Sequence, residues 1–235
     1  MKTKASGYSN FRGNKKAKFG PTQRKNIGDK NMKNYTVLFC VLVAAFFVML
    51  AIPSRALACA CCAEPGTYSI STKKPESYEI DELKRIGFLT SDLYMTEAGE
   101  DGIKGINPIG ISYKPSVLLQ NKTWKFTLTD NDGKTGTLTL PISTSMVAYM
   151  ADIHDGRQGG AGGPLLYKEW RFKAKVSSGT GIFQKGIAPA TDYFLVFQGR
   201  GNMCTSADQF THWRLEITGK KASYAFFGDL KPLEN

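Results

Sequence analysis

Thiols and an imidazole are the side chains of this chain best suited to chemistry. Three cysteines, Cys59, Cys61 and Cys62, lie within four positions, and Cys204 lies far along the chain with His212 eight residues after it. Thiolates are soft ligands that suit copper or zinc, and a hairpin could bring His212 close to a thiol. Structural zinc sites normally use spaced Cys or Cys/His pairs, which are absent here. We expect no cofactor, with copper or zinc bound by Cys59, Cys61, Cys62 and His212 as the alternative.

A disulfide is the simpler use of the same thiols. In an oxidising compartment Cys204 would bond to a cysteine of the cluster, with Cys61 and Cys62 as the candidates. Such a bridge would close a long loop and stabilise the domain by about 2–4 kcal/mol.

An enzyme centred on Cys204 and His212 is a further hypothesis. Ser206, Asp208 and His212 also supply a nominal nucleophile, acid and base. Residue types without geometry are weak evidence for catalysis, and no Gly-x-Ser-x-Gly motif is present. We therefore expect a protein that is not an enzyme.

An apolar segment places these cysteines outside the cytoplasm. Residues 37–52 are sixteen consecutive apolar residues, and Ala56-Leu57-Ala58 precedes Cys59. An apolar core that ends in an Ala-x-Ala step is typical of an export signal cleaved between Ala58 and Cys59. We expect residues 59–235 to be periplasmic or extracellular.

The same N-terminal residues allow three alternative interpretations. The polar residues before the core are many for a signal peptide, so Met32 could be the true start of the chain. An uncleaved segment 37–52 would anchor the protein in the membrane with its basic tail inside. Acylation of Cys59 would anchor it through a lipid.

The distribution of charge argues against a nucleic-acid partner. The formal net charge is +11, but residues 1–58 hold eleven of the Lys and Arg residues and only one acid, Asp29. The remaining chain is close to neutral, whereas a nucleic-acid surface needs clustered positive charge on the folded part. We therefore divide the chain into a basic segment (1–34), a signal or anchor segment (35–58), a cysteine segment (59–65) and a folded domain (66–235).

The folded domain is predicted to be all-β. Polar and apolar residues alternate at 67–71, 123–129 and 135–140, and Asp132-Gly133 predicts a tight hairpin turn between the last two. Further strands are predicted at 166–176, 193–198, 213–218 and 222–227, and residues 79–86 are the only helix candidate. Short strands separated by glycine-containing turns predict a single β-sandwich, with a β-barrel as the alternative.

Two further segments carry residues that could form a site. Asp152 and His154 would point the same way from a strand, as two metal ligands must, but a polar strand end is the preferred interpretation. Residues 157–164 are rich in glycine and predict a flexible connection, because the Gly-Lys-Ser/Thr ending of a phosphate loop is missing. The sequence therefore favours an exported binding or interaction module whose ligand or protein partner it does not specify.

Overall fold

The structure is a computed structural model that describes residues 64–159 and 162–233. The predicted segments 1–34 and 35–58 and the cysteines at 59, 61 and 62 lie outside the described residues. The elements follow one another as β1 (Tyr68–Lys73), α2 (Ser77–Leu83), β2 (Ile86–Phe88), β3 (Ser91–Leu93), η1 (Glu100–Gly102), β4 (Ser112–Gln120), β5 (Thr123–Asp130), β6 (Thr135–Pro141), β7 (Met146–Ala151), β8 (Tyr167–Lys175), β9 (Ser178–Gly181), β10 (Asp192–Arg200), β11 (Phe210–Thr218) and β12 (Ser223–Pro232).

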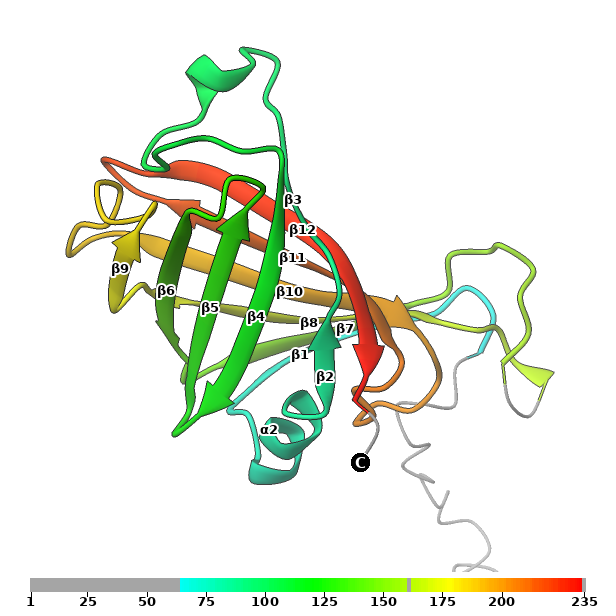
Figure 1. Ribbon diagram of the computed structural model, residues 1–235. Helices are drawn as coiled ribbons and strands as arrows, with labels where there is room; N and C mark the ends of the chain where they lie inside the picture. The colour runs from blue at the N-terminus through cyan, green and yellow to red at the C-terminus, as the bar shows by residue number, and fades with distance from the viewer. Residues whose placement is uncertain (1–63, 160–161, 234–235) are drawn as a thin grey trace, which may run out of the picture. The chain divides into compact units, whose positions relative to one another are not determined.

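The strands form one antiparallel sheet, which confirms the all-β prediction. Its order is β1-β7-β8-β10-β11-β12-β3-β4-β5-β6-β9, and β2 pairs with β12. In Figure 1 the strands β4, β5 and β6 lie across from β10, β11 and β12. The sheet therefore folds over so that its two halves face each other.

Hydrogen bonding continues around the fold. Thr139 of β6 pairs with Ser178 of β9, and Met146 of β7 pairs with Phe172 of β8. Between these pairs the backbone N–H of Ser177 donates to the carbonyl of Thr139 at 2.9 Å. Thus β6 with β7 and β9 with β8 act as two long, bent strands. The two facing layers resemble the predicted sandwich, and the continuous pairing resembles the barrel alternative.

Aromatic side chains fill the space between the layers. Trp124, Trp170 and Trp213 are each about 1 % exposed. The rings of Phe126 on β5 and Trp213 on β11 lie 5.8 Å apart, so the two layers are in direct contact. The alternating aromatic residues of the sequence are therefore core residues, as the period-two pattern favours.

The helix is shorter than predicted. It spans Ser77–Leu83, whereas the sequence predicted 79–86. The backbone N–H of Glu76 donates to the side chain of Glu79 at 3.0 Å, which begins the helix. Ile86 instead begins β2 and pairs with Pro232, and this pairing buries its side chain to 5 % exposure.

The predicted hairpin between β5 and β6 is confirmed. Gly133 has a φ of 81°, and Asp130 Oδ1 accepts hydrogen bonds from the backbone N–H groups of Asp132 and Lys134 at 3.0 and 2.8 Å. The strand β4 before it was not predicted.

In residues 64–159 and 162–233 no helix is long and apolar enough to cross a membrane.

The packing of Phe88 against residues of both layers predicts that truncating it lowers the stability of the domain. Its ring meets Phe126 and Trp213 edge-on, with centroids 5.2 Å away in each case. We expect Phe88→Ala to lower the free energy of unfolding by about 3 kcal/mol, because the removed ring leaves a cavity between the layers. Leu89→Ala is the control, since Leu89 is 47 % exposed and should cost less than about 0.5 kcal/mol. Denaturant unfolding measures both, and equal effects would contradict this packing.

Candidate functional site

Cys204 is the only cysteine among the described residues. It lines a cavity of about 180 Å³ together with Ser69 and Ser71 of β1 and with Lys168 of β8. The first described strand therefore runs beside Cys204. The predicted disulfide partners, Cys61 and Cys62, and the remaining cluster residue Cys59 lie outside the described part of the chain, so the bond stays a prediction.

His212 lies in a different hollow from Cys204. Its Nε2 atom is 3.5 Å from Asp229 Oδ1, and its Nδ1 atom is 2.8 Å from the hydroxyl of Thr211. Asp208 instead accepts a hydrogen bond from the hydroxyl of Ser206. The structure thus brings Ser206 and Asp208 together and directs His212 to Asp229.

Asp152 and His154 form a turn at the end of β7. Asp152 accepts hydrogen bonds from the backbone N–H groups of Gly66 and His154, each at 2.8 Å. These bonds lower the pKa of Asp152. The preferred interpretation, a polar strand end, fits this geometry. Across residues 64–159 and 162–233, no group of three or more His, Cys, Asp or Glu side chains is arranged to hold a metal ion.

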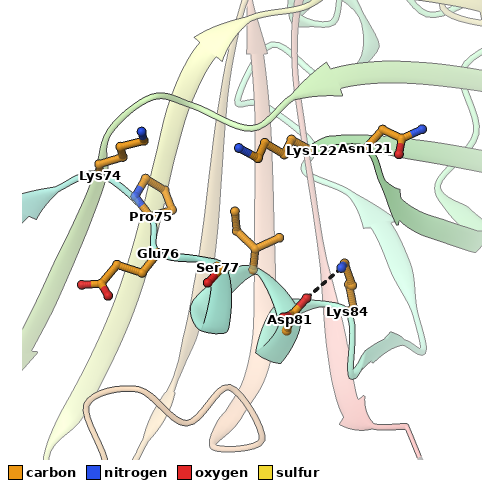
Figure 2. Close-up of a pocket in the computed structure, with 9 residues that line it drawn as sticks. Lys74, Pro75, Glu76, Ser77, Asp81, Lys84, Asn121 and Lys122 are labelled. Carbon is orange, nitrogen blue, oxygen red and sulfur yellow. Dashed lines mark hydrogen bonds and ion pairs between the residues drawn. The ribbon is translucent and has the colours of Figure 1, made fainter.

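A groove of about 610 Å³, here called the lysine groove, lies between α2 and the β4–β5 turn. In Figure 2 Lys122 extends over it from the turn, and Lys84 bonds to Asp81 at 2.7 Å. Its lining side chains are mostly exposed, so water screens their charges. The full lining is Lys74, Pro75, Glu76, Ser77, Ile80, Asp81, Lys84, Asn121 and Lys122.

A second hollow, here called the arginine pocket, has a volume of about 450 Å³ and lies on the outer face of the sheet. It is built from the ends of β8, β10 and β11 and from the loop before β8. It contains more hydrogen-bonding side chains on ordered strands than the lysine groove does. Its lining is Arg157, Leu165, Tyr167, Gln198, Gly199, Arg200, Thr211 and His212.

A β-bulge shapes the arginine pocket. Gln198 pairs with His212 and the next residue, Gly199, pairs with Phe210, so Thr211 is an extra residue on β11. A Cβ atom on Gly199 would lie 2.0 Å from the carbonyl oxygen of Gln209. Only glycine fits this close approach of the two backbones, and the bulge directs Thr211 toward the pocket.

Two guanidinium groups share one carboxylate at the rim of the pocket. Arg157 Nε lies 3.3 Å from Asp155 Oδ2, and Arg200 donates to the same oxygen. Each guanidinium carries five N–H donors. A single carboxylate therefore leaves one positive charge in excess and several donors open to a ligand.

Two residues that line the pocket, Tyr167 and Gln198, belong to a closed hydrogen-bond network around Glu169, which is 8 % exposed and does not itself line the pocket. This network is here called the floor. Gln198 donates to Glu169 at 2.9 Å, and Tyr167 and Arg171 donate to it as well. Burial alone would raise the pKa of Glu169, but these three bonds outweigh burial and the pKa is lowered. Burial and the bond to Glu169 raise the pKa of Tyr167. The floor is therefore an ionised carboxylate with its partners in place.

Of the residues that line this pocket, only His212 is a candidate site residue from the sequence alone. Arg157 and Arg200 lie beside glycines in segments whose sequence predicts turns. Tyr167 and Gln198 lie in segments whose sequence predicts ordinary strands. The pairing of Tyr167 with Arg200 and of Glu169 with Gln198 creates the site. No local pattern signals that pairing.

Lys168 is a buried cation between the sheet and the 201–209 loop. Its Nζ atom donates to the carbonyls of Met203 and Ser206 at 2.7 and 2.6 Å and to Gln209 Oε1 at 3.2 Å. The side chain is 1 % exposed, and burial lowers its pKa to about 8, against the opposing effect of Asp208. All three of its hydrogens have acceptors. Lys168 therefore holds the loop that carries Cys204.

We expect Lys168→Met to lower the free energy of unfolding by at least about 2 kcal/mol, because the buried carbonyl of Ser206 and the partly buried carbonyl of Met203 would lose their donor. Amide exchange at residues 203–209 should accelerate more than exchange in β5. Lys173→Met is the control, because Lys173 is exposed on the same strand. Equal stability losses in the two variants would show that Lys168 does not hold the loop.

The lowered pKa of Lys168 predicts a pH effect on stability. Below the folded pKa of about 8 both states are protonated, and between this value and 10.5 the unfolded state binds more protons. The contribution of this group to the free energy of unfolding therefore rises with pH across that window. Relative to Lys168→Met, the native sequence should gain stability between about pH 7 and about pH 10. Denaturant titrations measure the difference in free energy of unfolding between the two proteins. A difference that stays constant or narrows as the pH rises would contradict the lowered pKa of Lys168.

The described residues thus offer two open hollows and one buried lysine as chemically distinctive features. Comparisons with family models, with curated proteins and with solved structures found no match for this chain. The arginine pocket combines excess positive charge, neutral hydrogen-bonding groups and an ordered floor, and it is the candidate site.

Proposed function

We propose that this chain is an exported, non-enzymatic binding domain whose ligand carries an oxyanion that enters the arginine pocket. The observation that supports this is the sharing of Asp155 by Arg157 and Arg200. An incoming carboxylate or phosphate would neutralise the remaining charge. The planar guanidinium fork matches both of these groups.

The neutral groups of the pocket favour a ligand that also carries hydroxyls. Both hydrogens of the Gln198 amide are used within the floor, by Tyr167 at 2.8 Å and by Glu169 at 2.9 Å, so its carbonyl oxygen is left as an acceptor. The hydroxyl of Thr211, an exposed residue, bonds to His212 Nδ1 at 2.8 Å and can still accept a hydrogen bond from a ligand. These groups suit a sugar acid or a sugar phosphate.

Binding is favoured over catalysis by the state of the ionisable groups. Glu169 is held ionised by three donors and has a lowered pKa, which suits a structural carboxylate better than a general base. The hypothesis of an enzyme using Cys204 and His212 would require them to meet, whereas they line different cavities.

Export and a disulfide belong to the same proposal. We propose that residues 37–52 direct export and that Cys204 bonds to Cys61 or Cys62. The position of β1 supports the bond, because Ser69 and Ser71 line the same cavity as Cys204. Tyr68 follows Cys62 by six positions, and an extended chain over six residue steps reaches about 20 Å. The alternative of copper or zinc on the cluster would instead leave these thiols reduced.

Titration calorimetry on the full-length chain tests the proposed ligand class. Galacturonate and galactose 6-phosphate are the probes, and neutral galactose is the comparison. We expect at least one of the acids to bind and galactose to bind more weakly than that acid by at least about tenfold, because each lost charge-assisted hydrogen bond is worth about 1.5–3 kcal/mol. Arg200→Gln should remove this preference for the acid.

The control for this experiment is Lys122→Gln, which removes a cation from the lysine groove and leaves the arginine pocket intact. Loss of binding in Lys122→Gln with retention in Arg200→Gln would move the anion site to the lysine groove. Equal binding of the acids and galactose in the native chain would overturn the proposal.

A further inference from the structure

Tyrosine side chains continue from the arginine pocket across the outer face of the sheet. Tyr167 lines the pocket on β8, and Tyr149 lies beside it on β7 with ring centroids 6.4 Å apart. The next strand, β1, carries Tyr68 and Ile70, which are 73 % and 59 % exposed. These four residues are here called the tyrosine strip.

Strand register places the whole strip on one face. Glu169 pairs with Tyr149, and Tyr149 pairs with Ile70. In the neighbouring row Ala151 pairs with both Tyr167 and Tyr68. Directly paired residues of antiparallel strands point to the same side, so the strip and the arginine pocket share one surface. In Figure 1 the strands β1, β7, β8 and β10 follow one another across this part of the sheet.

The inner part of the strip is ordered before any ligand arrives. The guanidinium of Arg171 lies 5.0 Å from the ring centre of Tyr149, and Arg171 is itself bound to Glu169. The hydroxyl of Tyr167 is tied to the same carboxylate. A ligand that stacks on these rings would therefore lose little of its binding energy to fixing them.

We infer that the arginine pocket and the tyrosine strip form one binding track for an acidic oligosaccharide. This inference rests on the proposed function, because it places one sugar carboxylate against the N–H donors of Arg157 and Arg200 that Asp155 does not use. The following sugar rings then lie over Tyr167 and Tyr149 and reach Tyr68 at the sheet edge.

The dimensions and chemistry of the track suit this ligand. Neighbouring strands lie about 4.8 Å apart, so the path from β10 to β1 is about 15 Å long, which corresponds to about three sugar rings. A sugar ring presents C–H groups on its flat face and hydroxyls at its edge. Tyr149 and Tyr68 offer an apolar ring face for the former and a hydroxyl for the latter, whereas Tyr167 offers its ring, because its hydroxyl is bound to Glu169 and Gln198.

Binding of a galacturonate hexamer to the full-length chain, compared with monomeric galacturonate, tests the inference. We expect the hexamer to bind at least about tenfold more tightly than the monomer, since two further stacking contacts are each worth about 1 kcal/mol. Tyr68→Ser should weaken the hexamer by about fivefold and leave the monomer unchanged. Tyr68 is mostly exposed, so this change leaves the core intact.

The matched control is Tyr78→Ser, which removes a 41 % exposed tyrosine of α2, outside the strip. It should bind both ligands as the native chain does. Equal affinity for monomer and hexamer, or no effect of Tyr68→Ser on the hexamer, would overturn the track while leaving the oxyanion site in place. Failure of the monomer, the hexamer and galactose 6-phosphate alike would overturn the proposed function itself.

Discussion

A sheet that carries Trp and Phe side chains along one face must bury that face, and the rest of this structure depends on how it does so. The sheet folds over until β5 meets β11, and Phe126 packs against Trp213. The backbone groups at the fold cannot be left without partners in a dry interior. Between β6 and β7 the backbone N–H of Ile142 donates to the carbonyl of Lys122, and between β8 and β9 the N–H groups of Val176 and Ser177 donate to the carbonyls of Thr191 and Thr139.

This closure also makes an outer surface on which side chains can be placed with accuracy. Once the inner face is filled, the alternate residues of β7, β8 and β10 project outward in register. The bulge at Gln198 and Gly199 then interrupts the regular pairing at one end of the sheet. A hollow opens where the strands diverge, and the side chains around it are held by strands rather than by loops alone.

The interior and exterior of β8 illustrate how one strand serves two purposes. Lys168 points inward and holds the loop with Cys204 through buried carbonyls. Its neighbours Tyr167 and Glu169 point outward, where Tyr167 lines the arginine pocket and donates a hydrogen bond to Glu169. Burial of the Lys168 charge is tolerated because three acceptors surround it. Adjacent residues of one strand therefore contact the loop on one face of the sheet and line the pocket on the other.

Local patterns determined the fold class and part of its detail. Alternation at 123–129 and 135–140 and the Asp-Gly turn between them were sufficient for a hairpin, because period and turn conformation are properties of neighbouring residues. The helix end was wrong at Ile86, where pairing with Pro232 prevailed over local helix preference. Strand β4 was not predicted, because buried and exposed residues do not alternate regularly along it.

The candidate site was decided by tertiary structure. Asp155, Arg157 and Arg200 come from segments that the sequence presents only as turns, and they meet because β8 and β10 pair in one register. A shift of that register by one residue would move Tyr167 and Arg200 to opposite faces. The sequence by itself therefore determined an all-β domain, preceded in the chain by an apolar segment and by clustered cysteines. Only long-range pairing, which no local pattern encodes, brought two arginines onto one carboxylate.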